Sequence, residues 1–131
     1  MVNPRGRYEA DLALLQKALT TLRKALGVPK DDMSRDAVIQ RFEYVFELSW
    51  KTLQAAGALQ GVETRSPEES IRRAYELTWV EDPDPWFKAL EARNLTSHTY
   101  DETLAESVYQ TAKTFPALVD QILKKLSQKQ P

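Results

Sequence analysis

Cysteine is absent from the 131 residues of this chain. Its absence excludes disulfides, cysteine-ligated zinc, iron–sulfur clusters and thiol catalysis, and it fits a reducing compartment, so we expect a cytoplasmic protein. Glycine is scarce, with 4 residues, which argues against a sheet protein because sheets need many turns. Long apolar runs are also missing. We therefore expect neither a membrane span nor a signal peptide after the arginines of residues 1–7.

An excess of positive charge is the next missing feature, because the formal net charge is −1. A protein that holds long nucleic acid by bulk electrostatics is usually basic, so contact with RNA or a nucleotide would need a local basic site or a partner. Hydrophobic residues make up 42% and charged residues 28% of the chain. These values are normal for a globular protein, and the length predicts one domain over residues 1–131.

Apolar residues recur every three to four positions along most of the chain, which predicts amphipathic helices. We expect these helices at residues 7–26, 34–57, 66–77, 86–94 and 99–127. No segment alternates at period two over a useful length, so no strand is predicted. The fold class is therefore all-α, an up-and-down four-helix bundle with a short additional helix.

Cap residues and prolines set the expected helix ends. Ser66 is followed by proline and then by glutamate at the third position, which is a typical helix start. Asp84 is expected to cap the short helix, and Thr99 begins a capping-box pattern for the last one. Pro116 lies inside the last helix, but the apolar stripe keeps its register across it. We therefore expect a kink there and not two separate helices.

The segment from Glu91 to Asp101 holds the only histidine of the chain, His98. On one continuous helix Arg93 and His98 would lie about 140° apart, at about 100° per residue. The cap-like residues between them predict a break that lets Arg93 turn toward His98. If Thr99 is the N-cap, the free N–H groups of that helix end form a phosphate site. A lone histidine beside a cap is more often a cap or an ion-pair partner, and the residues alone leave both interpretations open.

Arg93, His98 and Tyr100 fit the Arg-x4-His-x-Tyr motif of HEPN domains. The chain most resembles the bacterial and archaeal branch encoded beside minimal nucleotidyltransferases, often called nucleotidyltransferase substrate-binding proteins. Residues 42–51, Phe-Glu-Tyr-Val-Phe-Glu-Leu-Ser-Trp-Lys, are similar to the second-helix signature of that branch. Ser66-Pro67 and the helix at Trp86 also match in position, so the resemblance covers nearly the whole chain.

This resemblance implies a homodimer with facing motifs and a toxin–antitoxin pairing. The HEPN subunit would be a metal-independent ribonuclease with Arg93 and His98 as catalytic residues, and it would need no cofactor. A nearby-encoded minimal nucleotidyltransferase would neutralise it by attaching AMP to Tyr100. Acid–base cleavage also needs two proton-transferring groups, and a two-fold axis would supply a second histidine. Two alternatives stay open: a non-catalytic subunit that presents a substrate or nucleotide, and a plain helical adaptor.

Several further residues are weaker candidates. Substrate-binding roles are considered for Asn94, Ser97, Arg72 and Arg73, although adjacent arginines on a helix are most often solvated. Glu43 and Glu47 share a helical face and could bind a cation, but two carboxylates without a third ligand are weak evidence. A solvated face or contacts at a dimer interface are more common.

Aromatic clusters allow two interpretations. Phe42, Phe46 and Trp50 recur at every fourth position and are predicted to be core. A base could stack on Trp79, Trp86 or Phe87, but packing beneath the proline-rich loop is the favoured interpretation.

Overall fold

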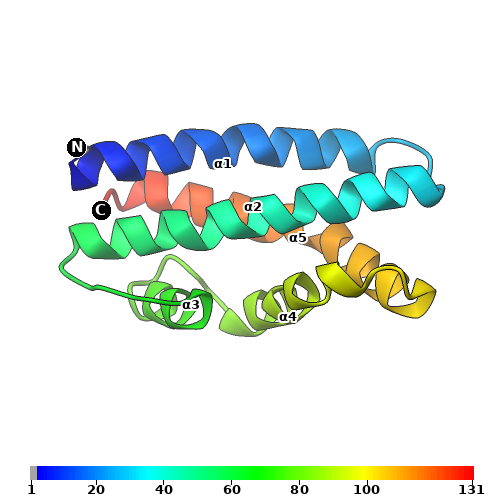
Figure 1. Cartoon of the computed structure of the whole chain (residues 1–131). Helices are drawn as coiled ribbons and strands as arrows, with labels where there is room; N and C mark the ends of the chain where they lie inside the picture. The colour runs from blue at the N-terminus through cyan, green and yellow to red at the C-terminus, as the bar shows by residue number, and fades with distance from the viewer. Residues whose placement is uncertain (1–2) are drawn as a thin grey trace.

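The computed structural model describes residues 3–131, and every regular element within that range is helical (Figure 1). The elements are α1 Pro4–Leu26, α2 Asp32–Leu59, α3 Pro67–Glu76, α4 Pro83–Asn94, the 3-10 turn η1 Thr96–His98 and α5 Glu102–Gln128. The all-α prediction is confirmed. No helix in residues 3–131 combines the length and the apolar character that a membrane crossing requires.

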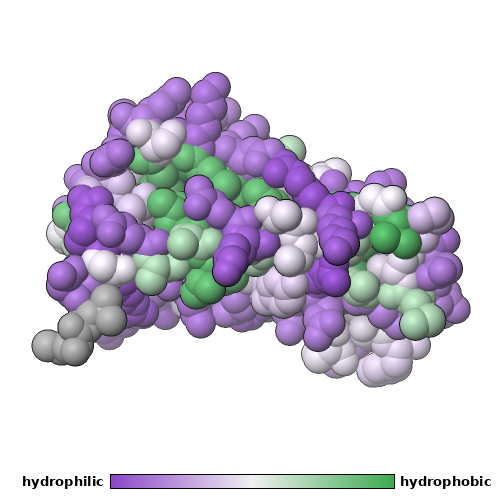
Figure 2. Space-filling model, turned by 90° about the horizontal axis from the view of Figure 1, so that it is seen from above, coloured by the Kyte–Doolittle hydropathy of each residue, from purple (hydrophilic) through white to green (hydrophobic). Residues whose placement is uncertain are grey.

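Three long helices form three sides of the bundle, and two shorter helices together form the fourth side. In Figure 1, α1, α2 and α5 run along its length, whereas α3 and α4 follow one another along the remaining side of α2. Seen from the α1 side, the surface is mostly hydrophilic, with a hydrophobic patch toward the end that holds the N-terminus (Figure 2). Along the side formed by α3 and α4, the chain runs from one end of α2 toward the other. The junction between α4 and α5 therefore lies against the polar face of α2.

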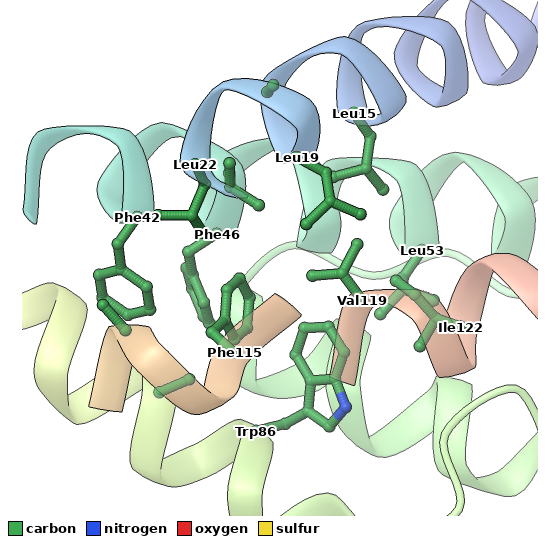
Figure 3. Packing of buried hydrophobic residues seen from close by; sticks show 14 of the residues in the cluster. Leu15, Leu19, Leu22, Phe42, Phe46, Leu53, Trp86, Phe115, Val119 and Ile122 are labelled. Atoms are coloured by element: carbon green, nitrogen blue, oxygen red, sulfur yellow. The ribbon is translucent and has the colours of Figure 1, made fainter. Parts of the chain in front are cut away.

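Aromatic side chains from three helices form the centre of the core (Figure 3). Phe115 of α5 makes edge-on contacts with Phe42 of α2 and Trp86 of α4, at ring-centroid distances of 5.1 Å and 5.3 Å. Phe46 completes the cluster, and all four side chains are fully buried. Burying one such side chain stabilises a fold by about 1.5–3 kcal/mol. The prediction that Phe42 and Phe46 are core residues is confirmed.

Three helices begin earlier than the sequence suggested. α1 begins at Pro4, capped by Asn3, and not at residue 7. α2 begins at Asp32 because Asp31 forms a capping box with Ser34, in which each side chain accepts the other's backbone N–H at 2.8 Å. α2 also continues past Gly57 to Leu59. Asp82, and not Asp84, caps α4, and its carboxylate accepts the Asp84 N–H at 3.0 Å. The predicted cap at Asp84 is therefore wrong.

The last helix begins later than expected, at Glu102, because its N-cap is Asp101. The predicted N-cap at Thr99 is wrong. The helix then continues through Pro116 to Gln128 as one element. This continuity confirms that Pro116 does not divide it into two helices.

Candidate functional site

The junction between α4 and α5, residues 93–101, is a series of tight turns. α4 ends at Asn94, and the His98 N–H donates to the Leu95 carbonyl at 2.9 Å to close the 3-10 turn η1. The Asp101 N–H then donates to the His98 carbonyl at 3.1 Å. The predicted helix break between Arg93 and His98 is confirmed.

Asp101 affects the phosphate site that was expected at the N-terminus of the last helix. Its carboxylate accepts the N–H groups of Thr103 and Leu104 at 2.9 Å and 3.1 Å. A helix N-terminus attracts phosphate through such free N–H groups, but here a side-chain anion already occupies them. The predicted phosphate site at the start of the last helix is therefore wrong. Tyr100 precedes the cap and does not lie in the first turn of α5.

His98 and Tyr100 are displayed together on the surface. Their rings meet edge-on at a centroid distance of 6.1 Å, and both side chains are exposed, Tyr100 to 84%. An aromatic ring that served only to pack across the helix start would be covered. The Tyr100 hydroxyl is therefore accessible to another macromolecule, and the His98 imidazole is free to meet a substrate.

Arg93 points toward α2. Its guanidinium forms an ion pair with Glu47, and its Nη1 donates to the Asn94 side chain at 3.2 Å. The side chains of Arg93 and Glu47 are 30% and 27% exposed, so the pair is partly shielded from water. Arg93 shares no hydrogen bond with His98 in the part of the chain that the structure describes. The expected turn of Arg93 toward His98 does not occur within one chain.

A cleft of about 370 Å³ lies between α2 and the junction. Its lining residues are Glu43, Glu47, Arg93, Asn94, Thr96 and Ser97. Thr96 donates its hydroxyl to the Glu43 carboxylate and also contacts the Arg93 carbonyl at 2.8 Å. Asn94 and Ser97 therefore line an open cleft beside Arg93.

Glu43 and Glu47 hold the junction against α2. Within residues 3–131 no group of three potential metal ligands is found, and each glutamate contacts a side chain of the junction. Sequence reasoning missed Glu47 as the partner of Arg93. The available signal was its place on the polar face of α2, one helical turn after Glu43.

A second cleft, of about 400 Å³, adjoins the first and shares Glu43 and Thr96 with it. Tyr100 lies at its edge, and Asp36 and Gln40 of α2 form the opposite side. Tyr100 therefore borders a cleft with two carboxylates, and the neighbouring cleft holds the Arg93 guanidinium together with Glu43 and Glu47. Of the two clefts, only the one beside Arg93 is lined by a cation.

The remaining candidates lie away from the junction. Arg72 and Arg73 belong to α3, are exposed, and pair with Glu68 and Glu76 at 2.8 Å each. Neither lines the two clefts beside α2.

The tryptophans of the proline-rich loop and of α4 serve packing. Trp79 and Trp86 are buried in the hydrophobic core, which confirms the packing interpretation for both. Phe87 is half-buried against the same core and lies under the Arg72 guanidinium, 5.8 Å from the ring centroid. Trp50 also packs partly buried against this core.

Comparisons with known proteins agree on one family. Residues 8–128 match the family model described as "Nucleotidyltransferase substrate binding protein like". A Haemophilus influenzae protein named "Probable ribonuclease HepT" is 30% identical over 96 residues, which cover 70% of this chain and 66% of that protein.

Two solved structures share the fold. One, from Thermus thermophilus, has a TM-score of 0.80 and 37% identity, and the match covers 86% of this chain and 98% of that one. The other, from Haemophilus influenzae, is described as having the fold of a substrate binding domain of a nucleotidyltransferase. Its TM-score is 0.74 at 27% identity, with 88% and 98% of the two chains covered. The chain therefore belongs to the nucleotidyltransferase substrate-binding protein family of HEPN-domain proteins.

Proposed function

We propose that this chain is the ribonuclease toxin of a two-gene toxin–antitoxin module that acts on RNA in the cytoplasm, with Arg93 and His98 as its catalytic residues. The observation that carries the proposal is the exposed His98 beside Tyr100 at a junction that also places Arg93 in a cleft. A relative named as a probable ribonuclease supports the same assignment.

The proposed reaction needs no metal ion. A base removes the proton of a ribose 2′-hydroxyl, whose oxygen attacks the adjacent phosphorus. The bond from phosphorus to the 5′-oxygen of the next nucleotide breaks, and an acid donates a proton to that oxygen. The products are a 2′,3′-cyclic phosphate and a 5′-hydroxyl. His98 supplies the imidazole for a proton transfer, and Arg93 stabilises the charge on the phosphorane.

One chain supplies a single histidine, so the reaction requires a second copy. A two-fold homodimer with facing junctions would contribute two copies each of His98 and Arg93 to one cleft. The exposure of His98 and Tyr100 leaves these side chains available for such an arrangement. Light scattering should show a dimer. A monomer at high concentration, or a dimer whose junctions point apart, would contradict this part of the proposal.

Tyr100 is the proposed site of control by the nucleotidyltransferase. Its phenol oxygen attacks the α-phosphorus of ATP, the bond to the β-phosphate oxygen breaks, and pyrophosphate leaves while a base of the partner takes the phenol proton. Because Asp101 already occupies the helix N–H groups, AMP on Tyr100 inhibits by occupying the space beside His98. Intact-mass analysis after incubation with the cognate nucleotidyltransferase and ATP should show one AMP per chain, and Tyr100→Phe should show none.

A second candidate function is a non-catalytic subunit that presents a substrate or nucleotide to its nucleotidyltransferase. The pairing of Arg93 with Glu47, with no hydrogen bond to His98 among the described residues, favours it. The matching family and the similar Haemophilus structure are both described by substrate binding for a nucleotidyltransferase, which is the same role.

Purified parent protein distinguishes the two functions. The ribonuclease proposal expects RNA cleavage that persists in a metal chelator and growth arrest when the chain is expressed alone. Arg93→Ala should abolish both, because the phosphorane loses its cation. Glu68→Gln, which leaves Arg72 of α3 unpaired, is a control and should behave as the parent. If the parent shows neither RNA cleavage nor growth arrest, the result would favour the non-catalytic subunit that presents a substrate.

A further inference from the structure

The polar face of α2 connects the junction to the other end of the bundle. At about 100° per residue, Lys51, Gln54 and Ala58 lie within about 40° of the direction of Glu47 around the helix axis. The face thus begins beside Arg93 and continues toward the end where α1 starts (Figure 1). The separation from Glu47 to Ala58 is about 16 Å, at about 1.5 Å per residue.

A cleft of about 400 Å³ lies at that far end. Gln54 and Ala58 form its α2 side, Arg7 contributes from α1, and Glu63 and Arg65 contribute from the loop between α2 and α3. Alanine at 58 leaves room that a longer side chain on the same face would fill.

The loop that carries Arg65 is held firmly on α2. The Gln54 side chain donates to the Thr64 carbonyl at 2.7 Å, and the buried Thr64 hydroxyl bonds to Ser70 at 2.7 Å. The Arg65 N–H donates to the Glu69 carboxylate at 3.1 Å. The backbone of Arg65 is therefore fixed, whereas its side chain remains exposed.

Arg7 and Arg65 differ from the other arginines of the bundle because, within residues 3–131, neither guanidinium has a hydrogen-bond or ion-pair partner. Arg23, Arg35, Arg72, Arg73 and Arg93 each form an ion pair, and Arg5 and Arg41 each donate to a backbone carbonyl. Glu63 is the opposing charge in this cleft, so the three side chains together carry a formal charge of +1. Guanidinium groups without a carboxylate partner are suited to phosphate, which they bind through two parallel hydrogen bonds.

We infer that this cleft binds phosphodiester groups of the single-stranded RNA whose cleavage occurs at the junction, an inference that rests on the proposed ribonuclease function. Lys51 lies on the path between the two clefts and is exposed without an ion pair among the described residues. For a strand whose bases stay stacked, at about 3.4 Å per nucleotide, a separation of about 16 Å corresponds to about five nucleotides. The cleft supplies the local basic site that an RNA-binding protein of net charge −1 requires.

Binding of labelled single-stranded RNA to the full chain tests this inference, in a His98→Ala background that prevents cleavage. With RNA of about ten nucleotides, Arg7→Gln and Arg65→Gln should each weaken binding about tenfold, the effect of one charge-assisted contact. Each should also lower the salt dependence, the slope of log K against log salt, by about 0.7. Glu63→Gln should tighten binding.

Arg23→Gln is the matched control, because it removes the same charge from α1 on nearly the opposite face, where Arg23 pairs with Asp120. It should leave RNA affinity within about twofold of the background, as expected for an exposed ion pair. RNA of about three nucleotides is shorter than the separation and should bind more weakly than the longer RNA. This length dependence should disappear in Arg65→Gln. If affinity does not depend on RNA length, one strand does not bind the junction and this cleft together. That result would overturn the inference.

Failure of this inference is distinguishable from failure of the proposed function. If the parent cleaves RNA but Arg7→Gln and Arg65→Gln bind it as Arg23→Gln does, RNA binding at the cleft is wrong. The proposed ribonuclease function is then unaffected. If the parent does not cleave RNA but its binding depends on both arginines and on length, the cleft stands without the ribonuclease. An absence of RNA binding overturns the inference.

Discussion

The aromatic cluster of the core and the aromatic pair at the junction use similar side chains in opposite ways. Phe42, Phe46, Trp86 and Phe115 are fully covered, and each contacts at least one other ring of the cluster. His98 and Tyr100 also contact each other, but in water. Removing a core ring would leave a cavity, whereas removing a junction ring would leave only solvent. The junction side chains therefore contribute little to the fold, and their presence needs a functional reason.

The largest expected effect is at the centre of the core. Phe115→Ala should lower the free energy of unfolding by about 3–5 kcal/mol, because it removes the ring that contacts both α2 and α4 and leaves a cavity. Chemical denaturation measured against the parent checks this value. A loss below about 1 kcal/mol would show that the cluster is not the centre of stability, and the contrast with the junction would fail.

An intermediate effect is expected at Glu47, which joins the junction to α2. Glu47→Gln should lower the free energy of unfolding by about 1 kcal/mol or less, because the ion pair with Arg93 is about a third exposed. The rate of RNA cleavage should fall by more than this loss of stability would explain, since the Arg93 guanidinium loses the group that orients it. Glu68→Gln removes a more exposed pair within α3 and should leave cleavage unchanged. Equal effects of both substitutions on cleavage would deny Glu47 a positioning role.

A smaller effect is expected in acid. Hydrogen bonds from Lys30 and Gln110 lower the pKa of Glu106, and the Ser34 backbone N–H lowers the pKa of Asp31. Both carboxylates thus have a lower pKa folded than unfolded. Their stabilisation is fully present above the ordinary carboxyl pKa of about 4, and it is lost as the pH falls through the folded values below that.

Thermal unfolding across the acid range measures this dependence. The melting temperature should fall as the pH drops below about 4, and Glu106→Gln should reduce that fall because it removes one titrating group. The aromatic cluster contains no titratable group, so the loss comes from carboxylates outside the core, Asp31 and Glu106 among them. A Glu106→Gln protein with the same acid dependence as the parent would contradict the assignment.

The sequence predicted the helices well and their ends less well. Apolar periodicity located all of the long helices because it records which face is buried. The starts of α2, α4 and α5 were misplaced because several aspartates, serines and threonines stand near each boundary, and each can cap a helix. Asp31, Asp82 and Asp101 are the caps in the structure. The choice among neighbours depends on packing that a local pattern does not contain.

The site was predicted in its residues but not in its contacts. The motif identified Arg93, His98 and Tyr100, and the structure places all three at one junction. The pairing of Arg93 with Glu47 joins residues that lie on different helices, and the place of Glu47 on the polar face of α2 does not by itself indicate which residue it contacts. The cleft at the far end of the bundle likewise combines Arg7 with Arg65, which come together only in the folded chain.

The smallest expected effect on stability is at His98, and the measurement on His98→Ala tests the account most directly. Its free energy of unfolding should stay within about 0.5 kcal/mol of the parent, because the side chain is exposed. On the same preparation, RNA cleavage in a metal chelator should fall at least about a hundredfold, the usual contribution of a general acid or base. A His98→Ala protein that cleaves RNA as fast as the parent would contradict the central claim that this junction is displayed for chemistry.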